Sequence, residues 1–144
     1  MMNENKTAYV FDTSAWLTLI EDEAGADVVE SLLEKANAGS VEILVSFMSF
    51  MEVFYITLQE RDIEEAQTRL SLMASLPIAR AESTVSLSIS AARLKAKYRM
   101  SVADAWIAAL AHEKGATLVH KDPEFQQIED AIEMLKLPYK GQAN

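Results

Sequence analysis

The sequence predicts an α/β fold with a central, mostly parallel sheet flanked by helices. Two observations predict it: short apolar segments alternate with longer segments of helical spacing, and only three prolines and four glycines interrupt the 144 residues. Alternating strands and helices imply a parallel sheet that is covered on both faces. A chain of this length can bury roughly 70% of the surface that it exposes when unfolded. We therefore expect one domain over residues 1–144, without internal repeats or linkers.

The expected elements follow from apolar periodicity and from glycine and proline punctuation. Residues 26–36 have helical spacing and stop near Gly39, and residues 47–60 are apolar almost all round. The segment 77–79 is a weak strand, and the helix over 101–114 ends at Gly115. The predicted strands are residues 7–11, 41–45, 77–79 and 116–120, and the predicted helices are residues 26–36, 47–60, 63–76, 84–98 and 101–114.

Composition excludes several classes of site and protein. Cysteine is absent and there are only two histidines, so disulfides, thiolate metal sites and histidine-rich zinc sites are excluded. A net charge of -9 argues against a protein that holds nucleic acid by bulk electrostatics, although metal ions can supply positive charge locally. The first six residues are polar and precede no apolar stretch of membrane-spanning length, so we expect no signal or membrane helix and a cytoplasmic location.

Four carboxylates stand where predicted strands end or predicted helices begin: Asp12, Glu52, Asp104 and Asp122. Acidic side chains are rarely buried unless they are paired or bind a cation. Ligands of open parallel sheets lie outside the carboxyl ends of the strands, so we expect the four acids to meet at one edge. Oxygen ligands without thiolates favour hard cations such as Mg2+ or Mn2+. The pattern therefore predicts a divalent metal site.

Each acid also has a purely structural interpretation as a helix cap. Residues 49–52 and 101–104 resemble capping boxes, and Asp12 is a good N-cap. Asp122 precedes a proline, which suits the first position of a helix. For any one acid, capping and metal binding are about equally favoured. The presence of all four favours metal binding.

Four segments, VFDTS (10–14), SFMEV (49–53), SVADAWIAALA (101–111) and GATLVHKDPEF (115–125), occur in the order typical of one family. In these segments the chain resembles the PIN-domain metal-dependent ribonucleases, and more narrowly the VapC-type toxins of toxin–antitoxin modules. The resemblance covers essentially the whole chain. It implies a single PIN-like domain, 1–144, with a Rossmann-like three-layer sandwich.

The resemblance also implies a function and a set of site residues. The function is endonucleolytic RNA cleavage by metal-activated water, with Mg2+ or Mn2+ bound by Asp12, Glu52, Asp104 and Asp122. A hydroxyl of Thr13 or Ser14 would support the site. The implied partners are an RNA substrate, an antitoxin whose C-terminal segment lies across the active-site groove, and a second copy of the chain in a homodimer. The alternative is a non-catalytic PIN-like module that binds RNA or protein.

Three further features have open interpretations. Many relatives carry Thr where this chain has His120, which is either a donor behind the metal ligands or, as we favour, a residue at the rim. Four basic residues crowd into residues 93–99, either as a phosphate-contacting strip or as cations that complement a helix C-terminus. Lys121 is a candidate phosphate contact, but a solvated surface lysine is the favoured interpretation.

Overall fold

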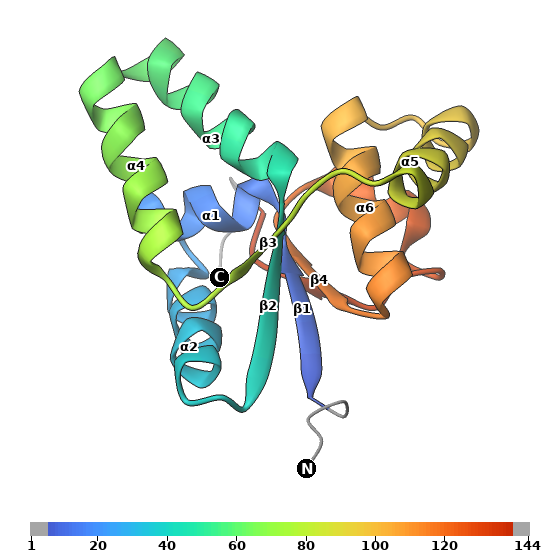
Figure 1. Cartoon of the computed structure of the whole chain (residues 1–144), viewed down its shortest axis with the longest axis horizontal. Coiled ribbons are helices and arrows are strands. Elements are labelled where there is room, and N and C mark those ends of the chain that lie inside the picture. The colour runs from blue at the N-terminus through green and yellow to red at the C-terminus, as the bar shows by residue number, and fades with distance from the viewer. Residues whose placement is uncertain (1–5, 140–144) are drawn as a thin grey trace.

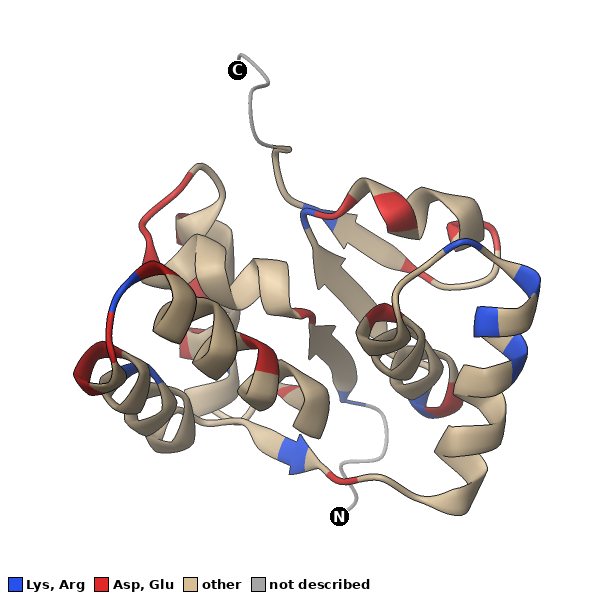
Figure 2. Cartoon of the chain, turned by 90° about the horizontal axis from the view of Figure 1, so that it is seen from above, with Lys and Arg blue, Asp and Glu red and all other residues tan. Residues whose placement is uncertain are grey.

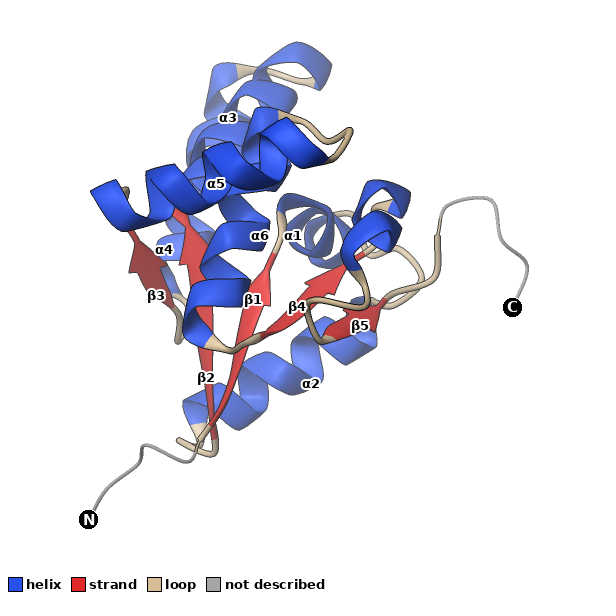
Figure 3. Ribbon diagram, turned by 90° about the vertical axis from the view of Figure 1, so that its right-hand side faces the viewer, coloured by secondary structure: helices blue, strands red, loops and turns tan. Residues whose placement is uncertain are grey.

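The computed structural model describes residues 6–139 and shows a five-stranded, fully parallel sheet between helices (Figures 1 and 3). The strand order is β3-β2-β1-β4-β5. The predicted α/β three-layer sandwich is thereby confirmed. The strands are β1 (Thr7–Phe11), β2 (Val41–Ser46), β3 (Ala79–Ala81), β4 (Thr117–His120) and β5 (Met134–Lys136).

Seven helical segments connect the strands within the described residues. They are α1 (Thr13–Ile20), α2 (Ala26–Asn37), α3 (Phe47–Glu60), α4 (Ile63–Ser75), α5 (Val85–Lys97), α6 (Val102–Lys114) and the 3-10 helix η1 (Pro123–Ile128). In Figure 1, α1 to α4 lie on one side of the sheet, whereas α5 and α6 lie on the other. The helix pair α3–α4 projects beyond the sheet edge.

The core is divided by the sheet because successive side chains of a strand point to opposite faces. Val10 and Leu118 pack with α5 and α6, while their neighbours Phe11 and Val119 pack with α1, α2 and α3. Trp16 is fully buried in this second cluster. Both faces of the central strands are therefore apolar, as is typical of a parallel sheet that is covered on both sides.

The strand order places a ligand-binding edge beside β1. The chain first adds β2 and β3 on one side of β1 and then adds β4 and β5 on the other, and Val10 pairs with both Leu44 and Leu118. Strand order therefore reverses between β1 and β4. In open α/β sheets, ligands bind at the carboxyl ends of the strands beside such a reversal.

Several local predictions differ from the structure. Helix α1 and strand β5 were not predicted as elements, and the third strand lies at Ala79–Ala81 instead of 77–79. The capping box at residues 49–52 is wrong, since Ser46 caps α3 by accepting from the Met48 N–H at 3.1 Å. Glu52 consequently lies in the second turn of α3 and not in the first.

In the described part of the chain, no helix is both long and apolar enough to cross a bilayer. The prediction that there is no signal sequence rests on the first six residues, of which Met1–Asn5 lie outside the described residues.

Candidate metal centre at the carboxyl edge of the sheet

Asp12 is held rigidly at the junction of β1 and α1. It is only 1% exposed, and its backbone N–H continues the sheet by donating to the Val119 carbonyl at 3.1 Å. Its carboxylate caps α1 by accepting from the Ala15 N–H at 2.8 Å, and it also accepts from the Ser14 hydroxyl at 2.7 and 2.8 Å. Asp12 is thus a cap, as one interpretation predicted, and a buried acid at the ligand-binding edge.

A group of three carboxylates lies beside Asp12. Asp104, Asp122 and Glu124 each offer an oxygen, and these oxygens lie within 4.8 Å of one another. Asp122 caps η1 by accepting from the Glu124 N–H at 2.9 Å, which aligns the two acids. The structure therefore brings together two predicted site residues and adds Glu124, which the sequence analysis did not select.

Asp104 reaches this group because another residue caps its helix. The Ser101 hydroxyl accepts from the Asp104 N–H at 3.1 Å and caps α6. A reciprocal capping box would have the Asp104 side chain return to the Ser101 N–H. Instead, Glu124 accepts from the Ser101 N–H at 3.4 Å. The Asp104 carboxylate is left to face Asp122 and Glu124.

Glu52 is positioned by a hydroxyl on the neighbouring helix. Thr13, at the start of α1, donates a hydrogen bond of 2.5 Å to Glu52, and a 3.2 Å hydrogen bond joins the hydroxyls of Thr13 and Ser49. Burial raises the pKa of Glu52, the Thr13 hydrogen bond lowers it, and the charge of Asp122 raises it. Glu52 is therefore close enough to Asp122 for the two charges to interact.

Burial and like charge together disfavour ionisation of Asp12 and Asp104. Burial raises the pKa of Asp12 to about 7 against the opposing hydrogen bonds from Ser14 and Ala15, with further increases from Asp122 and Glu52. Burial also raises the pKa of Asp104 to about 10, assisted by hydrogen bonds with Asp122 and Glu124. Carboxylates that share a site disfavour one another's ionisation, and a cation bound between them would remove this penalty.

These residues fit a hard divalent cation. Every candidate ligand is a carboxylate oxygen, the donor type that Mg2+ and Mn2+ prefer. The three oxygens within 4.8 Å of one another are close enough to share one ion. A cation at this position would offset the negative charge of these acids, of which Asp104 is buried and Asp122 half-buried.

A family model now decides the classification of the chain. The model of the PIN domain matches residues 9–131, which include all five acids of the cluster. The chain belongs to the PIN-domain family. The predicted family is thereby confirmed. No curated protein matches this PIN domain in sequence.

Solved structures share the fold at low sequence identity. VapBC2 from Rickettsia felis, bound to a promoter DNA fragment, has a TM-score of 0.75 at 19% identity, covering 92% of this chain and 100% of the other. DNA-bound VapBC from Salmonella typhimurium has a TM-score of 0.71 at 18% identity, and the match covers 90% of this chain and 98% of the other. Mycobacterium tuberculosis VapC20, a toxin that cleaves the sarcin–ricin loop, has a TM-score of 0.66 at 18% identity, and the match covers 83% of this chain and 93% of the other.

In this PIN domain, Ser14 connects the first acid to the end of β4. Besides donating to Asp12, its hydroxyl accepts from the Lys121 N–H at 2.8 Å. The Lys121 side chain is only 8% exposed and forms a 3.1 Å ion pair with Glu23. The interpretation of Lys121 as a solvated surface residue is therefore wrong, because the lysine fixes the loop before Asp122 against the α1–α2 connection.

His120 is buried and does not lie at the rim, so the favoured interpretation of this residue is wrong. It is 0% exposed, its ring meets Phe125 edge-on at 5.1 Å between centroids, and its Nδ1 accepts from the Asp122 N–H at 3.0 Å. Burial lowers the pKa of His120 to about 4, so the ring is neutral. His120 thus supports the backbone of Asp122 from beneath the site.

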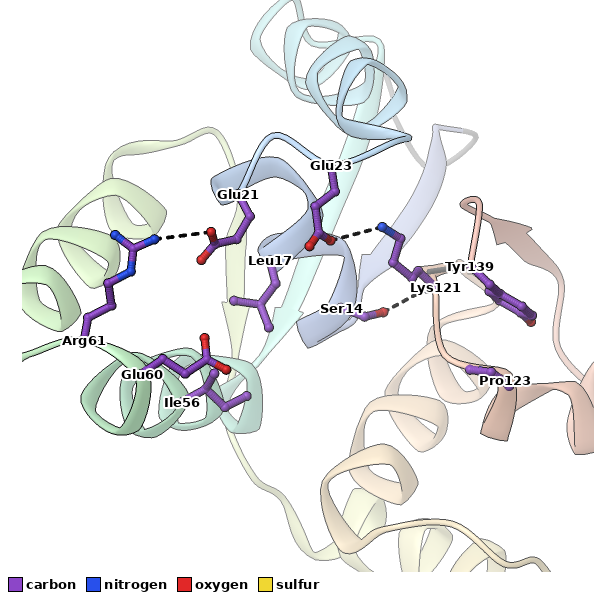
Figure 4. A pocket seen from close by; sticks show the side chains of 10 residues that line it. All are labelled: Ser14, Leu17, Glu21, Glu23, Ile56, Glu60, Arg61, Lys121, Pro123 and Tyr139. Atoms are coloured by element: carbon purple, nitrogen blue, oxygen red, sulfur yellow. Dashed lines mark hydrogen bonds and ion pairs between the residues drawn. The ribbon is translucent and has the colours of Figure 1, made fainter. Parts of the chain in front are cut away.

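A cavity of about 580 Å³ opens beside the acids, between α1, the end of α3 and the loop after β4 (Figure 4). Ser14 lines it and also contacts Asp12, so the cavity is continuous with the site. Its two cations are paired, Arg61 with Glu21 at 3.5 Å and Lys121 with Glu23 at 3.1 Å. The lining holds three glutamates, Glu21, Glu23 and Glu60, and only these two cations. The other lining residues are Leu17, Ile56, Pro123 and Tyr139.

Proposed function

We propose that this PIN domain is a Mg2+- or Mn2+-dependent endoribonuclease that cleaves RNA phosphodiester bonds with metal-activated water. The observation that supports the proposal most directly is the convergence of carboxylates, with Asp12 and Asp104 buried, at the carboxyl edge of the sheet beside the reversal of strand order. Such a cluster is costly to the fold unless a cation offsets it, which favours function over capping as its explanation.

Asp12, Asp104 and Asp122 would hold one or two ions, with Glu52 and Glu124 as further ligands. When bound, the ions supply Lewis-acid stabilisation of the phosphoryl oxygens and lower the pKa of the attacking water. The chain supplies rigid placement of the carboxylates. Ser14 and the Ala15 N–H fix Asp12, and the Asp122–Glu124 turn fixes the opposite side.

Neighbouring groups complete the positioning. Thr13 orients Glu52, and Ser14 also holds the N–H of Lys121. His120 acts through the backbone of Asp122, whose N–H donates to its ring, so we assign it a positioning role. In this proposal Thr13, Ser14 and His120 align acids that would otherwise repel one another.

The test is cleavage of RNA by purified protein that is free of any partner. We expect internal cuts in single-stranded or loop RNA with Mg2+ or Mn2+, and loss of cleavage when EDTA removes the metal. Undiminished cleavage in EDTA would show that the metal mechanism is wrong. Binding of RNA without cleavage, at full metal occupancy, would favour the alternative, a non-catalytic RNA-binding module.

We also propose that the protein is a toxin of a type II toxin–antitoxin pair and acts in the cytoplasm. The structural neighbours include VapBC complexes, and the acidic site and cavity suit a partner segment that carries Arg or Lys. A guanidinium or ammonium near Asp12 and Asp104 would take the place of the metal charge. The antitoxin therefore inhibits by occupying the metal site and the adjoining cavity.

Copurification and growth assays test the toxin proposal. Expression of the protein alone should arrest growth, and coexpression of a small protein encoded next to it should restore growth. The purified complex should contain that partner, and substitution of the partner's basic residues should release active nuclease. Isolation of only the free protein from the native host, together with normal growth on overexpression, would contradict the toxin assignment.

We propose a homodimer as the assembled form of the toxin. Apolar side chains are exposed at the start of α5 and of α6, with Val85 79% exposed and Val102 57% exposed. Burial of such side chains in an interface removes apolar surface from water. Light scattering of the purified protein should give the mass of two chains, and Val85→Glu should shift it to one.

A further inference from the structure

We propose that the groove along α5 holds the sugar-phosphate backbone of the RNA substrate beyond the cleaved bond, with Arg93 and Lys97 as its phosphate contacts. The groove has a volume of about 560 Å³ and runs along α5 from Ser86 to Tyr98. This inference rests on the proposed ribonuclease activity. It names the surface that binds the remainder of the same substrate.

The basic strip at residues 93–99 contrasts in charge with the rest of the chain. The net charge of the protein is -9, yet four of its thirteen basic residues fall within residues 93–99. Within residues 6–139, these four cations form none of the observed ion pairs, whereas Arg61, Arg69 and Lys121 are all neutralised by glutamates. Figure 2 shows the basic residues gathered on the C-terminal half of α5. The strip is therefore a cationic surface available to an anion.

The two proposed contacts share one face of the helix. Arg93 and Lys97 are separated by four residues and both line the groove, so their side chains are neighbours about 5–6 Å apart at Cβ. Lys95 lines a different, smaller cavity with Ala91 and Trp106. The helix thus presents a pair of cations to the groove and one cation to another face.

The groove also carries the other groups that single-stranded RNA uses. Tyr98 is half-buried at its end, and the Lys97 ammonium lies 5.4 Å from the ring centroid. Aromatic rings beside cations are stacking platforms for unpaired bases. The hydroxyl of Ser90 lines the wall and is an additional donor for phosphate oxygens. The Ser86 hydroxyl, at the far end of the groove, donates to Glu113 at 2.7 Å. This combination favours RNA over an acidic protein segment, which has no bases to stack.

Hydrogen bonds fix the end of the strip to the acid cluster. Gln127 of η1 accepts from the Arg99 N–H at 3.0 Å and donates to the Arg99 carbonyl at 2.7 Å. Gln127 also donates to the Glu124 carbonyl at 2.9 Å, and two residues later Ser101 donates to the Glu124 carboxylate. The turn between α5 and α6 is thereby anchored to the loop that carries Asp122 and Glu124. In this proposal the RNA leaves the groove at Tyr98, beside this anchored turn.

The first test measures RNA binding separately from cleavage. All variants carry Asp104→Asn so that the RNA remains intact, and the probe is a fluorescent, mixed-sequence single strand of about 20 nucleotides. Arg93→Gln/Lys97→Gln should reduce the slope of log K against log[salt] by about 1.4, or about 0.7 for each lost phosphate contact. Lys35→Gln/Lys95→Gln is the control, because it removes the same charge, including one lysine from the same last turn of α5.

The second test separates binding from chemistry in the otherwise unmodified enzyme. Arg93→Gln/Lys97→Gln should raise KM about tenfold for RNA of about 20 nucleotides and leave KM unchanged for RNA of about four nucleotides around the cleaved bond. The value of kcat should be unchanged for both. Arg93→Lys should keep the salt slope of the parent, because it retains the charge.

Three results with RNA alone would overturn the inference: a salt slope that falls equally in the control, a KM that rises equally for both RNA lengths, or no binding of single-stranded RNA. If Arg93→Gln/Lys97→Gln released a copurified protein partner and left RNA binding unaltered, the inference would also be overturned, because these residues would then bind protein. If the parent fails to cleave RNA but the salt slope falls as expected, the proposed nuclease activity fails while the RNA groove stands.

Discussion

Two regions of this PIN domain bury charge, and they differ in whether the chain neutralises it. Arg69 on α4 is 4% exposed and donates to Glu21 at 2.8 Å, to Glu65 at 3.0 Å and to the Thr57 hydroxyl at 3.3 Å. Its guanidinium joins α4 to α3 and to the end of α1. Opposite charges are thus paired within the chain, and no external group is needed.

The carboxyl edge of the sheet shows the opposite arrangement. Asp12, Asp104 and Asp122 bring charges of one sign together, and the hydroxyl and N–H donors around them are neutral. Buried charge is tolerated when it is paired or bound to a metal. The Arg69 network is therefore a structural feature, whereas the acid cluster indicates that a cation comes from outside the chain.

The largest expected difference between the regions is in catalysis. Asp12→Asn and Asp104→Asn should each reduce RNA cleavage at least about 10³-fold, because metal-based stabilisation of the transition state amounts to several kcal/mol. Arg69→Met should keep most of the activity of its folded fraction. Initial rates with Mn2+, corrected for folded protein by circular dichroism, measure this. Parental activity in Asp104→Asn would contradict the assignment of this residue to the metal centre.

The acid cluster should also make the metal-free protein less stable as pH rises. A carboxyl whose pKa is raised in the folded state favours folding at low pH, and this stability is lost as pH rises toward the folded pKa. For Asp12 and Asp104 these values are about 7 and about 10. His120, with a pKa lowered to about 4, opposes the trend only below its ordinary value of 6.5.

We therefore expect the free energy of unfolding in EDTA to fall by about 1 kcal/mol per pH unit between pH 6.5 and 8.5. Urea unfolding at several pH values measures it. Asp104→Asn should weaken the dependence, whereas Arg69→Met should leave it unchanged. A flat profile in the parent would mean that the acids are not coupled as the structure indicates.

Metal should stabilise the parent by mass action, and removal of a ligand should abolish the effect. Mn2+ at 100 times its dissociation constant would add about 2.7 kcal/mol to the free energy of unfolding. Arg69→Met should gain the same increment, and Asp12→Asn much less, although asparagine remains a good N-cap. Thermal unfolding of the parent, Arg69→Met and Asp12→Asn with and without Mn2+ measures these gains. Equal gains in all three proteins would exclude a shared metal site.

Loss of the internal ion pair should cost stability without affecting metal binding. Arg69→Met should lower the free energy of unfolding by about 2 kcal/mol. Breaking a fully buried ion pair costs about 3–5 kcal/mol, and the cost here is smaller because Glu21 and Glu65 are partly exposed. Arg61→Met is the matched control, since its 3.5 Å pair with Glu21 is exposed, and it should cost about 0.5 kcal/mol or less. Equal losses in urea unfolding would contradict the structural role of Arg69.

The smallest expected effect concerns the acid that only the structure selects. Glu124→Gln should weaken Mn2+ binding about tenfold, because an exposed ligand contributes less than the buried acids. Glu30→Gln, an exposed acid on α2, is the control. Titration calorimetry with Mn2+ measures both. Unaltered affinity in Glu124→Gln would remove this residue from the proposed site.

The sequence by itself determined the alternation of strands and helices, the fold class and the positions of Asp12, Asp104 and Asp122 at element ends. These signals are local, because apolar periodicity and capping patterns are contained within a few residues. Their limits are also local. Helix α1 is an eight-residue apolar segment without clear periodicity, and β5 has three residues, too few to show alternation.

The tertiary structure alone decided which side chains meet. Glu124 resembles any surface acid in the sequence, and only the fold brings it next to Asp104 and Asp122. His120 is buried beside the rings of Phe125 and Tyr139, which follow it in the chain. Lys121 finds Glu23 across 98 residues, and Arg69 finds Glu21 across 48. Such pairs depend on how distant segments pack, which no local pattern encodes. Local sequence patterns therefore specify the strands and helices. The packing of distant segments, at the reversal of strand order between β1 and β4, decides which charged side chains lie together.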